Sequence, residues 1–467
     1  MDGMWRAAKA AAELVRLHRQ DTVRIVTHID ADALSAAGIA ASCLQRAGVE
    51  FTVDYCKSLD NATLDRIRSG GAALTWYTDL GSAVHHELGK GDKIITDHHE
   101  VHVPEGALAV PHVNPHLHGI PEGDSISGAG CAYFVACAYQ ASNADLAATA
   151  IVGALGDLQD QKTGRLTGLN RRILADGEAH GVVRSRDDIR FFGRSSRPLP
   201  RFLRYADPPI PSILDSEDAA VEFLVTARIR VRDTNRWRTW YDLDEQERAR
   251  LMAAIEADYQ KAGRSSDRLR GEAYDLLKET EPELRDAKEF ATLLNSTARY
   301  DRPEVGLALA MGARGSLVSE ARTLLQGHRR SLGGAISFAT RQGLTSMGPI
   351  AYYHAGAEIR DTILGIVTGI LLGSGKGGVN QVLVGLADNK AGAIKVSARA
   401  PESLVQGGLD LSISLRSAAE AVGGSGGGHA GAAGATIPLG QEQAFLRAAA
   451  KRIEAQLQPA AIKSAGL

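Results

Sequence analysis

The sequence predicts an α/β protein with a parallel-sheet domain, a helical middle section and a smaller α/β domain. Three observations support this order. The first 160 residues alternate short apolar runs with alanine-rich helical stretches, residues 215–330 carry charge-rich helical patterns, and strand patterns return after residue 331. We expect domains at 1–183, 184–330 and 331–467, the second beginning with a connector rich in arginine and proline. Three units suit a chain of 467 residues.

In the first domain, apolar runs predict strands at 23–27, 51–56, 72–80 and 92–97, and helical spacing predicts helices at 31–48, 128–142 and 145–160. Strands that alternate with helices form a mainly parallel sheet. Functional groups in such sheets gather at the carboxyl ends of the strands.

In the last domain, strands are expected at 334–340, 348–356, 379–388, 392–400 and 435–440, with helices at 359–372 and 442–457. Between them lies the glycine-rich segment GGSGGGHAGAAG, residues 423–434. We interpret it as a loop whose backbone amides can converge on a phosphate, because glycine permits close approach and positive φ. The alternative is a flexible linker.

Composition excludes several classes of protein. Lys and Arg number 53 against 55 Asp and Glu, so a globally basic nucleic-acid-binding surface is excluded, although a local basic patch is not. The four cysteines form no CxxC pair, which excludes a zinc ribbon and a disulfide scaffold. The longest uncharged apolar stretch, 362–375, is shorter than the roughly 20 residues of a membrane span. With no signal peptide evident, we expect a cytoplasmic protein without membrane contact.

Acidic and histidine side chains cluster where the predicted strands of the first domain end. Ten of the fourteen histidines fall within the first 118 residues. The candidate residues are His28, Asp30, Asp32, Asp79, Asp97, His98, His99 and Asp157. Singly, an aspartate after a strand is more often a helix N-cap, and paired histidines are often surface residues. Together they predict a site for divalent cations of the Mn²⁺ type, because such ions combine carboxylate and imidazole ligands. Two adjacent ions could clamp a phosphate and activate water.

The motifs HIDADA (28–33), TDLG (78–81), DHH (97–99) and GDLQD (156–160) together resemble the DHH phosphoesterase superfamily. SARA (397–400) and GGGHAGAAG (426–434) resemble its DHH-associated substrate-binding domain. The connector and helical section are most similar to archaeal RecJ-like single-strand exonucleases of the GINS-associated type. One departure is Ala33, where many relatives have glycine.

The resemblance implies a role for each residue. His28 and Asp30 would bind a first Mn²⁺ ion with Asp79 bridging, and Asp32, His98 and Asp157 would complete a second site, with Mg²⁺ as an alternative metal. His99 would orient the site or contact the scissile phosphate, so that His99 and Asp79 are the expected catalytic residues. Asp97 would hold a histidine ring. The expected substrate-binding residues of the last domain are Ser397, Arg399, Gly427, Gly428 and His429.

The connector carries seven arginines between residues 184 and 204, interleaved with aromatic residues. Arginines that contact phosphates and rings that stack on bases suit single-stranded nucleic acid. The alternative is a connector whose apolar residues pack on the first domain while its arginines are solvated.

These observations predict a two-metal-dependent phosphodiesterase, a single-strand exonuclease that hydrolyses DNA, RNA or both. Its expected partners are single-stranded DNA or RNA and, among proteins, GINS or other replisome proteins. Two alternatives stay open: a phosphodiesterase for nano-oligonucleotides or cyclic dinucleotides, and a replisome scaffold with little activity.

Overall fold

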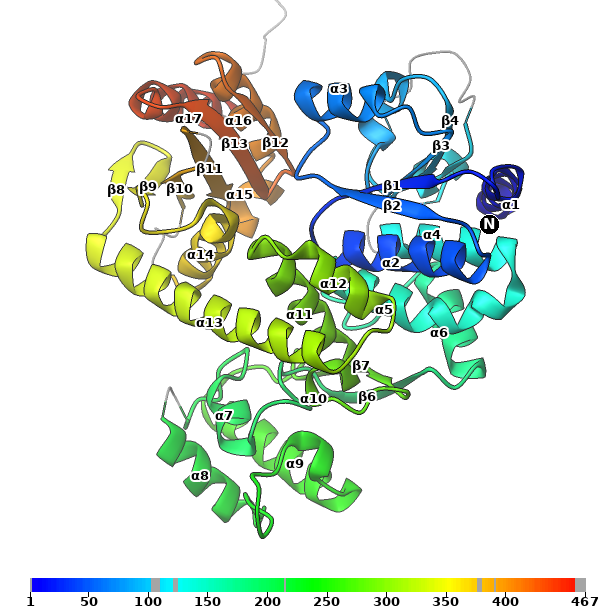
Figure 1. Cartoon of the computed structure of the whole chain (residues 1–467). Coiled ribbons are helices and arrows are strands. Elements are labelled where there is room, and N and C mark those ends of the chain that lie inside the picture. Colours follow the sequence, from blue (N-terminus) through cyan, green and yellow to red (C-terminus); the bar gives the residue numbers. More distant parts are fainter. Residues whose placement is uncertain are drawn as a thin grey trace, which may run out of the picture. The chain divides into compact units, whose positions relative to one another are not determined.

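A computed structural model describes residues 2–101, 110–120, 125–213, 216–375, 380–389 and 392–457. The chain forms two compact units, Met1–Leu325 and Gln326–Leu467 (Figure 1). The expected start of the last domain at residue 331 lies close to this boundary. The separate middle domain at 184–330 stays a prediction, since most of that segment belongs to the first compact unit.

The first unit is built on a parallel five-stranded sheet with the order β2-β1-β3-β4-β5. Its strands are β1 (Val23–Thr27), β2 (Phe51–Tyr55), β3 (Leu74–Thr78), β4 (Asp92–Thr96) and β5 (His112–Val113). Its first helices are α1 (Asp2–Leu17), α2 (Ala31–Arg46), α3 (Asn61–Ser69), α4 (Gly128–Tyr139), α5 (Ala147–Gly156) and α6 (Asn170–Ala179). The α/β class and the parallel sheet predicted from the sequence are confirmed.

Both faces of this sheet are covered. Ile25 and Trp76 pack into a large core shared with α2 and α4, whereas the next residues along each strand, Val26 and Tyr77, lie in a smaller core with Leu64 of α3. Successive strand residues point to opposite faces, so apolar pairs such as Ile25-Val26 indicate a strand buried on both sides.

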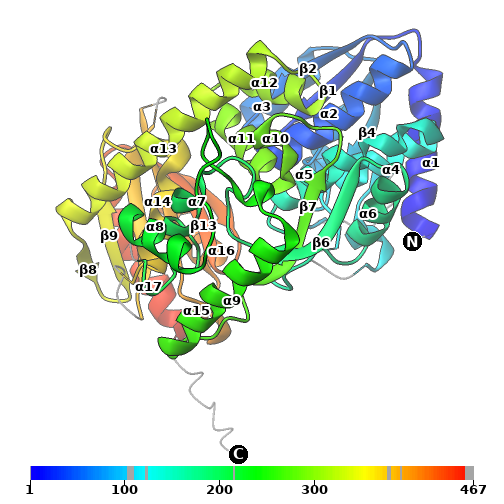
Figure 2. The same cartoon turned by 90° about the horizontal axis from the view of Figure 1, so that it is seen from below.

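After α6 the chain forms an antiparallel ribbon of β6 (Val183–Ile189) and β7 (Arg270–Leu276), and an insertion with its own core lies between these two strands (Figure 2). The insertion contains α7 (Leu199–Arg204), α8 (Glu217–Thr226) and α9 (Glu245–Lys261), which pack around Phe202 and Trp240. Strand β7 was not expected, because its sequence RGEAYDL is as rich in charge as the helices around it.

The connector packs against the rest of the first unit. Arg194 is 3% exposed and forms ion pairs with Asp188 at 2.9 Å and with Asp286 at 2.5 Å. Phe191 and Phe202 are buried in the core of the insertion. The expectation that this segment presents its arginines and aromatic rings to a nucleic-acid strand is therefore wrong for these three residues. Sequence alone did not reveal it, because Asp286 lies 92 residues further along the chain.

The first unit ends with helices that return to the sheet domain. They are α10 (Pro282–Arg285), α11 (Ala287–Arg299) and α12 (Pro303–Ala310), followed by the long α13 (Ser316–Gln342) that runs into the second unit. The strand expected at 334–340 is wrong, since these residues continue α13. Ala335 and Ala339 are both buried, and their spacing of four residues is that of one helix face.

The second unit contains a six-stranded sheet with the order β12-β13-β11-β10-β9-β8. Its strands are β8 (Thr345–Met347), β9 (Ile350–His354), β10 (Val382–Asp388), β11 (Ala393–Arg399), β12 (Ser425–Gly428) and β13 (Ala432–Pro438). Its helices are α14 (Asp361–Gly373), α15 (Glu402–Gln406), α16 (Leu411–Glu420) and α17 (Glu442–Leu457).

The glycine-rich segment of this unit is not the loop that the sequence predicted. Residues 425–428 form strand β12, which pairs with β13 so that Gly427 lies opposite Gly434. A short turn at His429 joins the two strands, and the amide of His429 donates to the carbonyl of Ala432 at 2.9 Å. Backbone pairing with β13 overrides the low strand propensity of glycine.

Two predicted absences concern cysteine and membrane contact. The structure describes all four cysteines as free thiols. Across the described ranges, no helix combines the length and the apolar character that crossing a bilayer requires.

Candidate metal centre

The candidate side chains meet at one edge of the parallel sheet, where neighbouring strands β1, β3 and β4 end. His28 and Asp30 follow β1, Asp79 follows β3, and Asp97 follows β4. Asp79 adopts a φ of 58°, in the left-handed region, which aspartate tolerates better than most residues. Its side chain is 4% exposed.

The carboxylates of the first motif are held by backbone amides. Asp30 caps α2 and accepts a hydrogen bond from the amide of Ala33 at 2.9 Å. Asp32, in the first turn of α2, accepts from the amides of Gly128 at 2.7 Å and Ala129 at 3.0 Å. These amides begin α4, where the helix dipole favours a negative charge. The N-cap interpretation of Asp30 is thus correct, and it leaves the other carboxylate oxygen of Asp30 for His28.

His98 lies at the centre of the cluster. Its Nε2 atom is 3.5 Å from Asp79 Oδ1, 3.6 Å from Asp157 Oδ2 and 3.8 Å from Asp32 Oδ2. Among the described residues, two groups offer ligand atoms within 4.8 Å of one another and could hold a metal ion. They are Asp32, His98 and Asp157, and Asp79, His98 and His99.

The first of these groups coincides with the second metal site that the family resemblance implies. His28 and Asp30, expected at the other site, belong to neither group. They do line a cavity of about 310 Å³ together with Asp79 and His99. Nδ1 of His28 and Oδ2 of Asp30 are 2.9 Å apart, so these two side chains contact each other.

The electrostatics of the cluster suit a cation. Asp79 Oδ1 is buried and forms no hydrogen bond with any described residue. Burial, together with the charges of Asp32, Asp30, Asp97 and Asp157, raises the pKa of Asp79 well above its ordinary value. Burial likewise raises the pKa of Asp157 to about 6. Crowded carboxylates with a buried, unsatisfied oxygen are what a divalent ion would neutralise, so these residues fit the metal that the family implies.

Asp97 and His99 form a pair beside the cluster. Asp97 accepts hydrogen bonds from the amide of Ser82 at 2.9 Å, from the amide of His98 at 2.8 Å and from His99 Nδ1 at 2.7 Å. The hydrogen bond that His99 donates to Asp97 raises the pKa of His99 to about 9. The His99 side chain is half exposed at the cavity and, when protonated, is suited to donate a hydrogen bond to a phosphate. Asp97 thus contacts the ring of His99, and its role in orienting the site stays a prediction.

Three residues near the cluster, Gly128, Gly153 and Gln159, were not among the candidate site residues, although Gln159 lies within the motif GDLQD. A Cβ on Gly128 would lie 2.4 Å from Asp79 Oδ1, and one on Gly153 would lie 2.5 Å from Asp32 Oδ1, so both glycines leave room for carboxylates. Gln159 Nε2 donates to Asp157 Oδ2 at 2.9 Å. Glycines inside the apolar helices α4 and α5 were the available hint.

Helix α11 also contributes to the site, although it lies more than 250 residues further along the chain. Asn295 Oδ1 accepts a hydrogen bond from the amide of Ala31, 264 residues away, at 2.9 Å. Burial lowers the pKa of Arg299, and the negative charge of Asp30 opposes that effect. The guanidinium of Arg299 therefore lies near Asp30 of the first motif. No local sequence pattern predicts such long-range contacts.

The expected substrate-binding residues of the second unit lie on its sheet. Ser397 and Arg399 are neighbours on one face of β11, where Arg399 Nη1 donates to Ser397 Oγ at 3.3 Å. Gly365 of α14 leaves room for both, since a Cβ there would lie 2.9 Å from each. Gly427 and Gly428 belong to β12, and His429 is exposed in the turn that follows.

Two segments of the chain match known domain families, and a similar protein is known over nearly the whole length. The DHH-CID domain family matches residues 191–270, and the DHHA1 domain family matches residues 348–455. The chain is 26% identical over 460 residues to an uncharacterized protein of Methanocaldococcus jannaschii, covering 97% of this chain and 98% of that protein.

Solved structures share the fold at low sequence identity. RecJ from Thermus thermophilus in complex with Mn²⁺ matches with a TM-score of 0.60 and 17% identity, over 96% of this chain and 55% of RecJ. Cdc45 from Entamoeba histolytica matches with a TM-score of 0.62 and 11% identity, over 96% and 99% of the two chains. The chain thus spans about half the length of the Thermus RecJ.

The two matched domain families and the shared fold define what the chain resembles: it has the RecJ-like fold, seen also in Cdc45, and segments that match the DHH-CID and DHHA1 domain families. The DHH-CID domain is the insertion between β6 and β7, and the DHHA1 domain is the sheet of the second unit.

Proposed function

We propose that the chain is a two-metal-dependent phosphodiesterase that degrades single-stranded DNA, RNA or both as an exonuclease. The observation that carries this proposal is the convergence of Asp32, Asp79 and Asp157 on Nε2 of His98. A single histidine does not balance the charge of three gathered carboxylates, whereas divalent ions do.

In this proposal Asp32, His98 and Asp157 hold one Mn²⁺ ion, and His28, Asp30 and Asp79 hold or approach the other. When bound, the two ions supply Lewis-acid stabilisation of a phosphate and activation of a water molecule. Mg²⁺ is the alternative ion, and RecJ from Thermus thermophilus has been crystallised with either metal.

The remaining residues of the site bind and orient. Asp97 holds His99 as an imidazolium that can donate a hydrogen bond to a phosphate oxygen. Gln159 fixes one oxygen of Asp157. In the second unit, Ser397, Arg399 and His429 are proposed to bind another phosphate of the substrate, with Gly427 and Gly428 allowing the backbone to approach it.

The first alternative is a replisome scaffold with little activity. The fold does not separate this function from the enzyme, because Cdc45 overlays the chain as well as RecJ does. The carboxylate cluster favours the enzyme, since a scaffold has no need for buried, crowded carboxylates. The second alternative, a phosphodiesterase for nano-oligonucleotides or cyclic dinucleotides, differs from the proposal in its substrate and would use the same metal centre.

Digestion of 5′- and 3′-labelled DNA and RNA strands, alongside a dinucleotide, tests the proposal. We expect Mn²⁺ or Mg²⁺ to support stepwise shortening of single strands, and a chelator to stop it. Asp32→Asn should abolish shortening, whereas Asp65→Asn, which changes an exposed carboxylate on α3, should not. Cleavage of the dinucleotide alone would favour the second alternative, and a folded, metal-binding protein that cleaves nothing would favour the scaffold.

A further inference from the structure

A pocket of about 680 Å³ in the first unit opens beside the carboxylate cluster and extends to the DHH-CID domain. We call it the basic pocket. Its charged lining residues are Lys162, Arg190, Arg268, Lys288, Asp157 and Asp207. Four of these side chains are cationic and two are anionic, in a chain whose net charge is −2. General basicity of the chain therefore does not explain the pocket.

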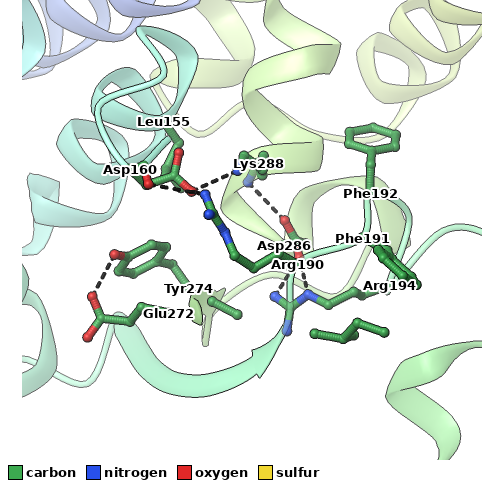
Figure 3. A pocket seen from close by; sticks show the side chains of 12 residues that line it. Leu155, Asp160, Arg190, Phe191, Phe192, Arg194, Glu272, Tyr274, Asp286 and Lys288 are labelled. Atoms are coloured by element: carbon green, nitrogen blue, oxygen red, sulfur yellow. Dashed lines mark hydrogen bonds and ion pairs between the residues drawn. The ribbon is translucent and has the colours of Figure 1, made fainter. Parts of the chain in front are cut away.

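Two of the cations are held by one buried carboxylate. Arg190 Nη2 lies 2.9 Å and Lys288 Nζ lies 2.7 Å from Asp160 Oδ2, and the Asp160 side chain is 2% exposed (Figure 3). Figure 3 shows Arg190 and Lys288 approaching Asp160 from different segments of the chain. One carboxylate neutralises one of two cations, so this side of the pocket keeps a positive charge in a fixed position.

The other two cations are exposed and uncommitted. Lys162 follows α5 and Arg268 precedes β7. In the part of the chain that the structure describes, neither side chain forms a hydrogen bond or an ion pair. They flank the pocket from two elements, one beside the carboxylate cluster and one at the end of the DHH-CID domain. The exposed side chain of Leu158 adds an apolar surface to the lining of the pocket.

We propose that the basic pocket binds backbone phosphates of the nucleic-acid strand whose scissile phosphate lies at the carboxylate cluster. The inference rests on the proposed function and adds a path for the strand, from Asp157 to Arg268. The unpaired cations favour a nucleic-acid strand as the occupant, because cations bind backbone phosphates with release of counterions. In addition, Leu158 can pack against a base. An acidic protein segment is the competing occupant, but it would not explain why the pocket begins at Asp157.

The test is the salt dependence of binding, measured by fluorescence anisotropy in Mn²⁺ with a labelled phosphorothioate oligothymidylate that resists cleavage. In the double variant Lys162→Gln and Arg268→Gln, we expect the slope of log affinity against log salt to fall by about 1.4, from roughly 0.7 per phosphate contact on a single strand. Affinity at low salt should fall about tenfold. The matched control is Lys261→Gln with Arg264→Gln, which removes two exposed cations from the same insertion outside the pocket.

Equal slopes in the two double variants would overturn the inference. So would a labelled polyglutamate peptide that binds as tightly as the oligonucleotide and loses affinity in the pocket variant alone, since the pocket would then take an acidic protein segment. Failure of the proposed function gives a different result. If the wild-type protein cleaves no strand, but the double variant still lowers the salt-dependence slope as expected, then the pocket binds a strand and the protein is not the proposed exonuclease.

Discussion

Gly128→Ala should damage metal binding without removing any ligand. Gly128 begins α4, and its amide already donates to Asp32. A Cβ at this position would lie 2.4 Å from Oδ1, 2.6 Å from Cβ and 2.7 Å from Cγ of Asp79. The whole Asp79 side chain blocks the added methyl group, so a simple rotation of the carboxylate does not make room.

The size of the effect follows from these distances. Ordinary non-bonded contact requires the carboxylate or the start of α4 to move by about 1 Å. Metal–ligand distances tolerate only about 0.2 Å, so Asp79 would no longer ligate in its original position. We expect manganese affinity to fall about 10- to 100-fold, or about 1.4–2.7 kcal/mol. Crowding of the helix start should also lower stability by about 1–3 kcal/mol.

Isothermal titration with Mn²⁺ and thermal unfolding measure these two effects on the same protein. Gly130→Ala is the matched control on the same helix. There, a Cβ would lie 2.6 Å from Ile126 Cγ1 and 3.0 Å from Ile173 Cδ1, so it crowds apolar side chains only. This control should lose stability and keep its manganese affinity. A folded Gly128→Ala protein that binds manganese as the parent does would refute the placement of Asp79 at the metal.

Further predictions concern other parts of the molecule. Asp79→Asn should abolish hydrolysis and manganese binding at one site. It should nevertheless raise the melting temperature of the metal-free protein, because it removes a buried charge and asparagine tolerates a φ of 58°. An unchanged or lower melting temperature would contradict this prediction. Arg194→Met should lower the free energy of unfolding by about 3–5 kcal/mol, because it leaves buried carboxylates unpaired. The salt dependence of strand binding should not change. A change in that salt dependence would show that Arg194 contacts the strand after all. Burial raises the pKa of Glu289 to about 7 from 4.5, so its contribution to stability is full below pH 4.5 and is lost as the pH rises through 7; the melting temperature of Glu289→Gln relative to the parent should therefore rise over that interval. His429→Ala should raise KM with manganese content unchanged, and loss of manganese would place His429 in the metal centre.

The sequence was a good guide wherever the signal was local. Strand β1 followed by HIDAD, and β4 followed by DHH, place their side chains at a sheet edge because parallel strands end together. Apolar runs sufficed to predict the parallel sheet, and helical spacing sufficed to predict α2 and α17.

It failed where distant segments decide the outcome. The arginine-rich connector reads as a strand-binding surface until Asp286, far along the chain, is seen to neutralise Arg194. The segment 423–434 reads as a loop because glycine has low strand propensity, but a neighbouring strand supplies its backbone partners. Asn295 and Arg299 reach the first motif from α11, and no pattern near either residue indicates that contact.

The most direct test of the account is the manganese stoichiometry of the purified chain, measured by titration for the wild type and for Asp32→Asn. We predict about two ions per chain in the wild type. In the variant we predict the loss of at least one ion from a protein that remains folded. A folded wild-type chain that binds no manganese, or a variant that keeps the full complement, would contradict the claim that Asp32, Asp79, His98 and Asp157 form a metal centre.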